Sequence, residues 1–168
     1  MADNARQLEL LRELSAVARR ERIRFWLRGG WALDFHLGRV TRAHADIDVV
    51  TWERHRARLA GALEAVGLRA EPSPNPKTQL VFTERGEEVS VLLVVRYGAD
   101  VVVRGLERFP FPRGAFGDVR RTLGGVTCRV FSAAALLDER ERHHLWSGRD
   151  LRPKDVESIR LLRELARV

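Results

Sequence analysis

The spacing of apolar residues divides the first third of the chain into short helical and extended segments. From about Asn4 to Arg20, leucine and valine recur every three or four positions, which predicts an amphipathic helix. The run from Ile23 to Leu27 predicts a strand that ends at a glycine pair, and a helical pattern resumes from Trp31 to Leu37. From Asp46 to Thr51, acids alternate with aliphatic residues, as in a strand.

The remaining two thirds continue in the same way. A helical pattern covers Trp52 to Gly67 and is followed by a proline-rich loop. Alternating patterns then predict a meander and a later hairpin, over residues 79–83, 88–95, 100–104, 119–123 and 126–131. Ser132 is placed to cap a following helix, and a last helix is expected from Pro153 to Ala166, because proline is tolerated in the first helical turn.

Length and composition are those of one compact domain. The chain has 168 residues, 45% of them hydrophobic, so a single domain over residues 1–168 is expected. Apolar runs such as Val91 to Val95 are far shorter than the roughly 20 residues that cross a bilayer, and the N-terminus lacks a signal-peptide core. We therefore expect no membrane association and a cytoplasmic location. The single cysteine, Cys128, is expected to be a small buried hydrophobic residue.

The net charge of +7 indicates which partners the chain attracts. Its basic residues are spread over every segment instead of forming one stripe, so nucleic-acid binding ranks last among the functions considered. Nearly all of them are arginine, which is typical of GC-rich coding. A basic domain attracts polyanions such as nucleoside triphosphates and repels polycations.

Two short motifs carry candidate chemistry. Gly29 and Gly30 end a predicted strand just before a helix, where free backbone N–H groups can receive a phosphate. Asp46 and Asp48 are two positions apart on a strand, so their carboxylates project to the same side while Ile47 faces the apolar interior. Like charges held this close need a compensating cation, and Mg²⁺ prefers such oxygen ligands.

These motifs occur within a longer resemblance. The runs Leu27-Arg-Gly-Gly-Trp-Ala-Leu-Asp34, Leu37-Gly-Arg-Val-Thr-Arg42 and His44-Ala-Asp-Ile-Asp48 resemble the lincosamide and aminoglycoside nucleotidyltransferases. Gly124 to Ser132 and Arg152 to Asp155 are similar to the late hairpin and the C-terminal helix entry of that family. The resemblance implies an α+β fold, with a mixed sheet flanked by helices and C-terminal helices. It also implies transfer of a nucleoside monophosphate from a nucleoside triphosphate, expected to be ATP, to a hydroxyl of a small antibiotic or natural product.

The resemblance also implies site residues. Asp46 and Asp48 would be catalytic and would bind Mg²⁺. The nucleotide would be held by Gly29, Gly30, Arg42 and Lys154.

The chain departs from the family at one strand. The family's third carboxylate and a following histidine are replaced here by Ser90 and Leu92. Glu88, two residues earlier on the same face, is the candidate for the missing acid, whereas alternation turns Glu87 away. Two hypotheses follow: an active Mg²⁺-dependent transferase, or a protein that kept the fold, lost transfer, and acts on or binds a natural-product intermediate.

The expected acceptor is a small hydroxylated molecule. Because the chain is basic, a neutral acceptor is favoured over a polycation. Trp52, Phe82 and Tyr97 could line its site, although a role in the core is the commoner one for such residues. His44 is close enough to the acid pair in sequence to orient it.

Overall fold

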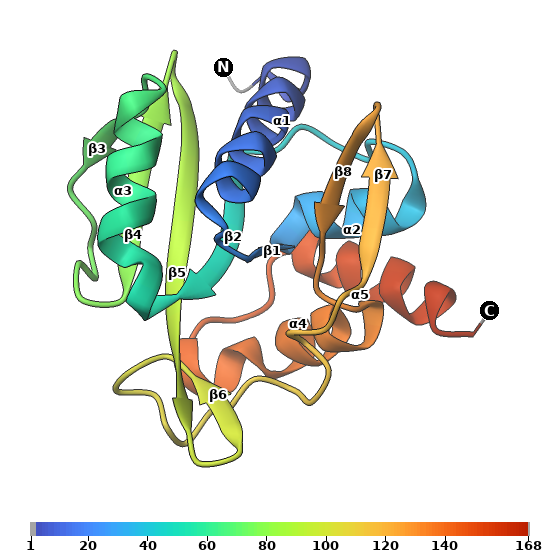
Figure 1. Ribbon diagram of the computed structural model, residues 1–168. Coiled ribbons are helices and arrows are strands. Elements are labelled where there is room, and N and C mark those ends of the chain that lie inside the picture. Colours follow the sequence, from blue (N-terminus) through green and yellow to red (C-terminus); the bar gives the residue numbers. More distant parts are fainter. Residues whose placement is uncertain (1–2, 168) are drawn as a thin grey trace.

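The computed structural model describes residues 3–167, which form five α-helices and eight strands (Figure 1). In chain order the elements are α1 (Asn4–Glu21), β1 (Phe25–Arg28), α2 (Gly29–Leu37), β2 (Asp46–Trp52), η1 (Glu53–His55), α3 (Arg56–Ala65), β3 (Arg69–Glu71), β4 (Gln79–Glu84), β5 (Glu87–Tyr97), β6 (Asp100–Val102), β7 (Arg120–Leu123), β8 (Val126–Arg129), α4 (Ala133–Ser147) and α5 (Pro153–Leu165). None of the helices described is long and apolar enough to cross a membrane.

Six strands form one mixed sheet, as the α+β prediction requires. Its order is β1-β2-β5-β4-β3, with β6 paired to the far end of β5. β2 and β5 run parallel, and the other pairs are antiparallel. β7 and β8 form the separate hairpin predicted from the sequence. In Figure 1, α1 and α3 lie together over one face of the sheet, while α4 and α5 pack against each other and lie below α2.

Local signals explain where several helices begin and end. The Asp3 side chain accepts hydrogen bonds from the backbone N–H groups of Ala5 and Arg6, and α1 ends at Arg22 in the left-handed conformation. Ser132 caps α4 by accepting from the Ala135 N–H, as predicted. These caps satisfy backbone groups that helix ends would otherwise leave unpaired.

One predicted boundary was wrong. The sequence pattern placed Trp52 at the start of a helix, but Trp52 is the last residue of β2, and α3 begins only at Arg56. Its indole is 9% exposed and packs edge-on against Trp26, with ring centroids 6.2 Å apart. Burial of the ring and its contact with Trp26 stabilise this position of Trp52 in the strand. The short edge strand β3 was also not predicted.

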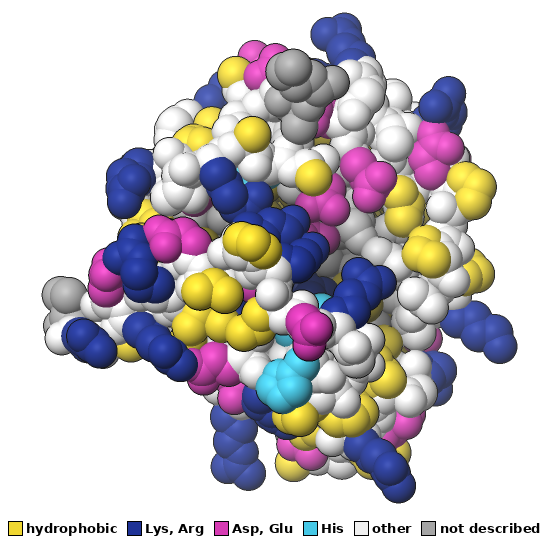
Figure 2. All heavy atoms as spheres, turned by 180° about the vertical axis from the view of Figure 1, so that it is seen from behind, with side chains coloured by type: hydrophobic (Ala, Val, Ile, Leu, Met, Phe, Trp, Pro, Cys, Tyr) yellow, Lys and Arg dark blue, Asp and Glu magenta, His cyan; other side chains and the backbone are white. Residues whose placement is uncertain are grey.

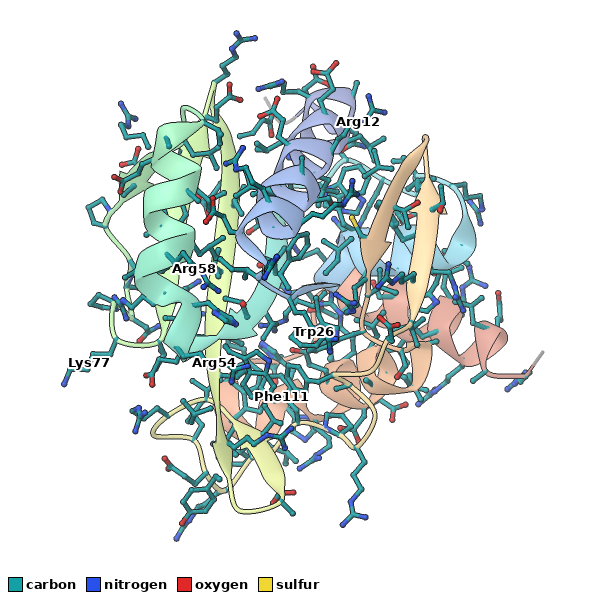
Figure 3. The ribbon with its side chains drawn as sticks, viewed as in Figure 1. Arg12, Trp26, Arg54, Arg58, Lys77 and Phe111 are labelled. Carbon is teal, nitrogen blue, oxygen red and sulfur yellow. The ribbon has the colours of Figure 1, made fainter. Side chains whose placement is uncertain are left out.

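An aromatic cluster joins the long loop after β6 to the sheet. Phe116 lies 5.1 Å from Trp26 and 5.3 Å from both Phe111 and Phe131, measured between ring centroids and always edge-on. Figure 3 shows Trp26 and Phe111 close to the middle of the molecule, whereas Arg12 and Lys77 point outward. The cluster holds the loop that forms one wall of the site described below.

Candidate active site

The two aspartates of β2 share one face of the sheet, as predicted. Asp46 and Asp48 are half-buried, whereas Ile47 between them is fully buried on the other side. An Oδ2 atom of Asp48 lies so close to Gly29 that a Cβ on this glycine would be 2.8 Å away. The acid pair and the glycine turn therefore adjoin in space, although nearly twenty residues separate them in sequence.

The environment of Asp46 disfavours its negative charge. Burial, followed by the nearby charges of Asp48 and Glu88, raises the pKa of Asp46 to about 6. Lys154 and Arg42 act in the opposite direction but do not compensate fully. A half-buried group of carboxylates with excess negative charge fits a hard cation such as Mg²⁺. Among residues 3–167, however, no three His, Cys, Asp or Glu side chains form a complete ligand group.

The glycine pair forms the start of α2. Gly29, at φ +68°, is the first residue of the helix, and Arg28 before it provides no side-chain cap. A side chain at Gly30 would meet Arg42 Nη2 at 2.4 Å and His44 Nδ1 at 2.7 Å. Both positions therefore need glycine, for conformation or for space. The start of α2 has no side-chain cap and adjoins Asp48, and free N–H groups at a helix start can bind an anion.

A buried carboxylate holds the loop between α2 and β2. Asp34 is fully buried and accepts hydrogen bonds from Thr41 N at 3.1 Å, Thr41 Oγ1 at 2.6 Å and His44 Nε2 at 2.6 Å. The His44 ring also packs on Trp31, with centroids 4.5 Å apart. The hypothesis that His44 orients the acid pair is therefore wrong: its ring bonds to Asp34 and positions the loop that carries Arg42.

α1 supports the same loop from the other side. Asn4 donates to the Arg42 carbonyl at 2.8 Å and accepts from the His44 N–H at 3.0 Å. Gln7 is fully buried and donates to the His44 carbonyl and to Glu87 Oε2. Glu87 is thus a structural acid turned away from the site, as the strand alternation predicted.

Lys154 reaches the site from the start of α5. Lys154 lies within electrostatic range of Asp46 and Arg42, because its charge lowers the pKa of Asp46 while that of Arg42 lowers the pKa of Lys154. The helix entry is fixed by Asp155, which bonds to Arg140 at 2.8 Å and to Arg152 at 2.7 Å. Burial raises the pKa of Asp155, but hydrogen bonds from the Arg152 side chain and backbone, together with the charges of Arg140 and Arg152, lower it to about 2.

The register of β5 places Glu88, the candidate for the third acid, and Ser90, which stands where the family has its carboxylate. In the parallel pair β2 and β5, Glu88 lies opposite Asp46 and Ser90 lies opposite Asp48. Glu88 is exposed and lies on the same face as the aspartates, as expected. Its role as the third acid stays a prediction. Ser90 is 8% exposed and accepts a hydrogen bond from Gln79.

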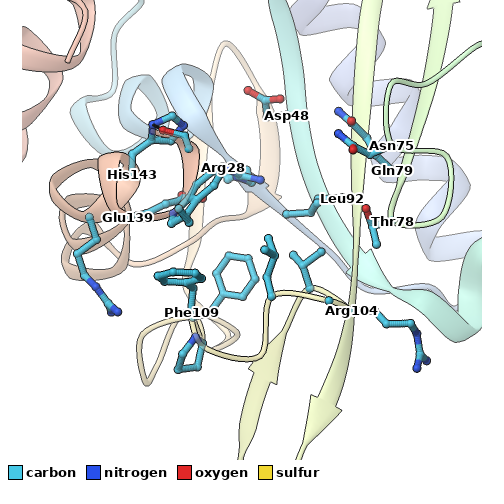
Figure 4. A pocket seen from close by; sticks show the side chains of 18 of the residues that line it. Arg28, Asp48, Asn75, Thr78, Gln79, Leu92, Arg104, Phe109, Glu139 and His143 are labelled. Carbon is cyan, nitrogen blue, oxygen red and sulfur yellow. Dashed lines mark hydrogen bonds and ion pairs between the residues drawn. The ribbon is translucent and has the colours of Figure 1, made fainter. Parts of the chain in front are cut away.

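A cavity of about 730 Å³ opens beside Asp48 (Figure 4). Asp48, Gln79 and Ser90 line one end, and α4 contributes an acidic and basic wall. The apolar wall comes from the loop after β6 and from α4, through Leu106, Phe109, Pro110, Phe111, Pro112 and Trp146. The sequence interpretation missed this wall. The Phe109–Pro112 run is its only sequence signal.

The three aromatic residues that the sequence offered as possible walls of the acceptor site lie elsewhere. Trp52 and Phe82 belong to the hydrophobic core, which confirms the prediction that such residues more commonly serve the core. Tyr97 is 59% exposed at the end of β5, away from the residues that line the cavity.

Solved structures define the class of this fold. The structure of ANT(2'')-Ia in complex with adenylyl-2''-tobramycin has a TM-score of 0.75 and 25% identity, covering 93% of this chain and 87% of that one. The lincomycin-bound lincosamide antibiotic adenylyltransferase LnuA has a TM-score of 0.72 and 20% identity, covering 98% of each chain. The fold is that of the nucleotidyltransferases, which confirms the predicted fold class.

Sequence comparison then identifies the family. The family model described as aminoglycoside-2''-adenylyltransferase matches residues 10–162, so the chain belongs to that family. A 2''-aminoglycoside nucleotidyltransferase of Klebsiella pneumoniae is 40% identical over 63 residues, which are 38% of this chain and 36% of that protein. A lincosamide resistance protein of Staphylococcus haemolyticus is 34% identical over 50 residues, 30% of this chain and 31% of that protein. These matched segments span about a third of the curated relatives.

Proposed function

We propose that this protein transfers an adenylyl group from ATP to a hydroxyl of a small antibiotic. The observation that carries the proposal is the position of the acid pair on β2. Asp48 lies against Gly29 at the uncapped start of α2 and lines one end of a cavity, and Asp46 projects from the same face of the strand. Such an arrangement supplies binding groups for a triphosphate next to space for an acceptor. Membership of the aminoglycoside-2''-adenylyltransferase family and the activities named for its relatives support adenylyl transfer.

In this proposal the chain's own residues position the reactants and accept a proton. The glycine turn and the cationic side chains of Arg42 and Lys154 bind phosphate oxygens. Mg²⁺ held by Asp46 and Asp48 would neutralise charge on the triphosphate. The acceptor oxygen forms a bond to the α-phosphorus as the bond to the bridging oxygen breaks, and pyrophosphate leaves with that electron pair. Glu88 takes the proton of the acceptor hydroxyl.

The comparisons bear on the charge of the acceptor. Aminoglycosides, for which the family is named, are polycations, and this counts against the expectation of a neutral acceptor. Two acidic side chains of α4, Asp138 and Glu139, line the cavity and could bind amines of the acceptor. Each already pairs with an arginine, at 3.3 Å to Arg142 and 2.5 Å to Arg28. We therefore propose a hydroxylated antibiotic as the acceptor class, and aminoglycosides as the first compounds to test.

A mass measurement tests the proposed function. With Mg²⁺ and ATP, the protein is expected to add one adenylyl group to tobramycin or lincomycin and to release pyrophosphate. A chelator should abolish both products, because Mg²⁺ takes part in binding ATP. If calorimetry detects no ATP binding in the presence of Mg²⁺, the proposed function is wrong, and the hypothesis of a fold that lost transfer replaces it.

Glu88→Gln tests the third acid. The amide cannot take a proton, so the turnover rate should fall by about 100-fold, with ATP affinity changed by only a few-fold. Glu64→Gln, on the exposed surface of α3, is the matched control and should behave like the wild type. A Glu88→Gln protein with wild-type turnover would exclude Glu88 as the base.

Nucleic-acid binding has little support in the surface charge. On the face shown in Figure 2, basic side chains are scattered among acidic and hydrophobic ones and form no continuous stripe. Extended nucleic-acid sites usually show such a stripe.

A further inference from the structure

Ser90 occupies a decisive position in the cavity. It lies opposite Asp48 in the parallel pair of β2 and β5, and both residues line the end of the cavity where the acceptor would meet the nucleotide. The side chain is 8% exposed, so any ligand that reaches it displaces little water. A carboxylate here would only accept hydrogen bonds, whereas a hydroxyl can both accept and donate.

Gln79 determines whether the Ser90 hydroxyl donates or accepts a hydrogen bond toward a ligand. It is the first residue of β4, the other neighbour of β5, and its Nε2 donates to Ser90 Oγ at 2.6 Å. An oxygen that accepts from the amide keeps its own hydrogen for a second partner. Within residues 3–167, no other hydrogen bond of the Ser90 side chain is formed. Figure 4 shows Gln79 and Asp48 in the same part of the cavity.

We propose that Ser90 and Gln79 form the subsite for the acceptor hydroxyl, an inference that rests on the proposed function. Ser90 donates its hydrogen to a lone pair of the attacking alcohol oxygen, and Gln79 is a positioning residue that aims this donor. The alcohol keeps its own hydrogen for the base. An ammonium nitrogen has no lone pair to accept the bond, so the subsite selects an alcohol of the acceptor over its charged amines.

Kinetics of four variants test this assignment with whichever of tobramycin and lincomycin the wild type modifies faster. Ser90→Ala should raise the acceptor KM about tenfold and leave the affinity for Mg²⁺ and ATP within twofold, because one hydrogen bond to the acceptor is lost. Gln79→Met should have a similar effect. The double variant should be no worse than Ser90→Ala, since Gln79 acts through Ser90. Ser90→Thr should restore a wild-type KM.

Several results would overturn the assignment. One is an unchanged acceptor KM in Ser90→Ala, and another is additive effects in the double variant. A loss of ATP affinity in Ser90→Ala would also overturn it, because the hydroxyl would then contact a phosphate. Ser90→Asp restores the family carboxylate and tests whether Ser90 has a function of its own. We expect a higher acceptor KM for this variant. Faster turnover than the wild type would contradict the assignment. Thr122→Val, which removes an exposed hydroxyl on β7, is the control. If the wild type modifies neither antibiotic, the proposed function fails first and the subsite with it.

Discussion

Asp48→Asn is expected to lower adenylyl transfer by about 1,000-fold while the protein stays folded. The amide has the size of the carboxylate but no charge, so the site loses half of the anionic pair that would bind Mg²⁺. Loss of one electrostatic contact to a transition state typically costs about 100- to 1,000-fold. Turnover with saturating ATP and acceptor, measured beside Mg²⁺-dependent ATP binding, gives the result directly.

The unfolding temperature of Asp48→Asn shows whether a loss of transfer comes from the site or from unfolding. Asp46 and Asp48 repel each other in the metal-free protein, so Asp48→Asn should unfold at the same temperature as the wild type or a slightly higher one. Asp100→Asn, at an exposed position in β6, should leave both stability and transfer unchanged. If Asp48→Asn transfers at the wild-type rate, the acid pair has no role in the reaction.

Asp34→Ala is expected to destabilise the protein by about 3 kcal/mol. The change leaves the Thr41 N–H, the Thr41 hydroxyl and the His44 ring without their partner in a buried place. An unsatisfied buried polar group costs about 1–3 kcal/mol, and more when a charge-assisted bond is lost. Urea unfolding followed by circular dichroism measures this loss as a lower midpoint with an unchanged slope.

The same variant should also bind ATP more weakly where it is still folded. Asp34 holds the loop that places Arg42 against Gly30, so loosening the loop would move the proposed phosphate-binding side chain of Arg42 from its position. Asp100→Ala is the control for stability. A wild-type unfolding midpoint for Asp34→Ala would show that the loop does not depend on this carboxylate.

Local sequence was sufficient for most of the elements. The alternation in Asp46-Ile-Asp48, the glycine pair after an apolar strand and the Ser132 cap predicted their structures correctly, because each depends on neighbours within a few residues. Trp52 was misplaced because its partner Trp26 lies in another strand. Its position depends on packing that no local pattern reports.

The candidate site shows the same division. The sequence determined which groups are candidates for the chemistry. These are Asp46 and Asp48 on one face of β2, Glu88 on β5, and the glycines at the start of α2. Only the tertiary structure decided which groups meet. It placed Asp48 against Gly29, joined His44 to Asp34 and not to the acids, and set Gln79 on Ser90. These contacts depend on strand order, register and packing between distant segments, and a periodic pattern along the chain carries no information about them.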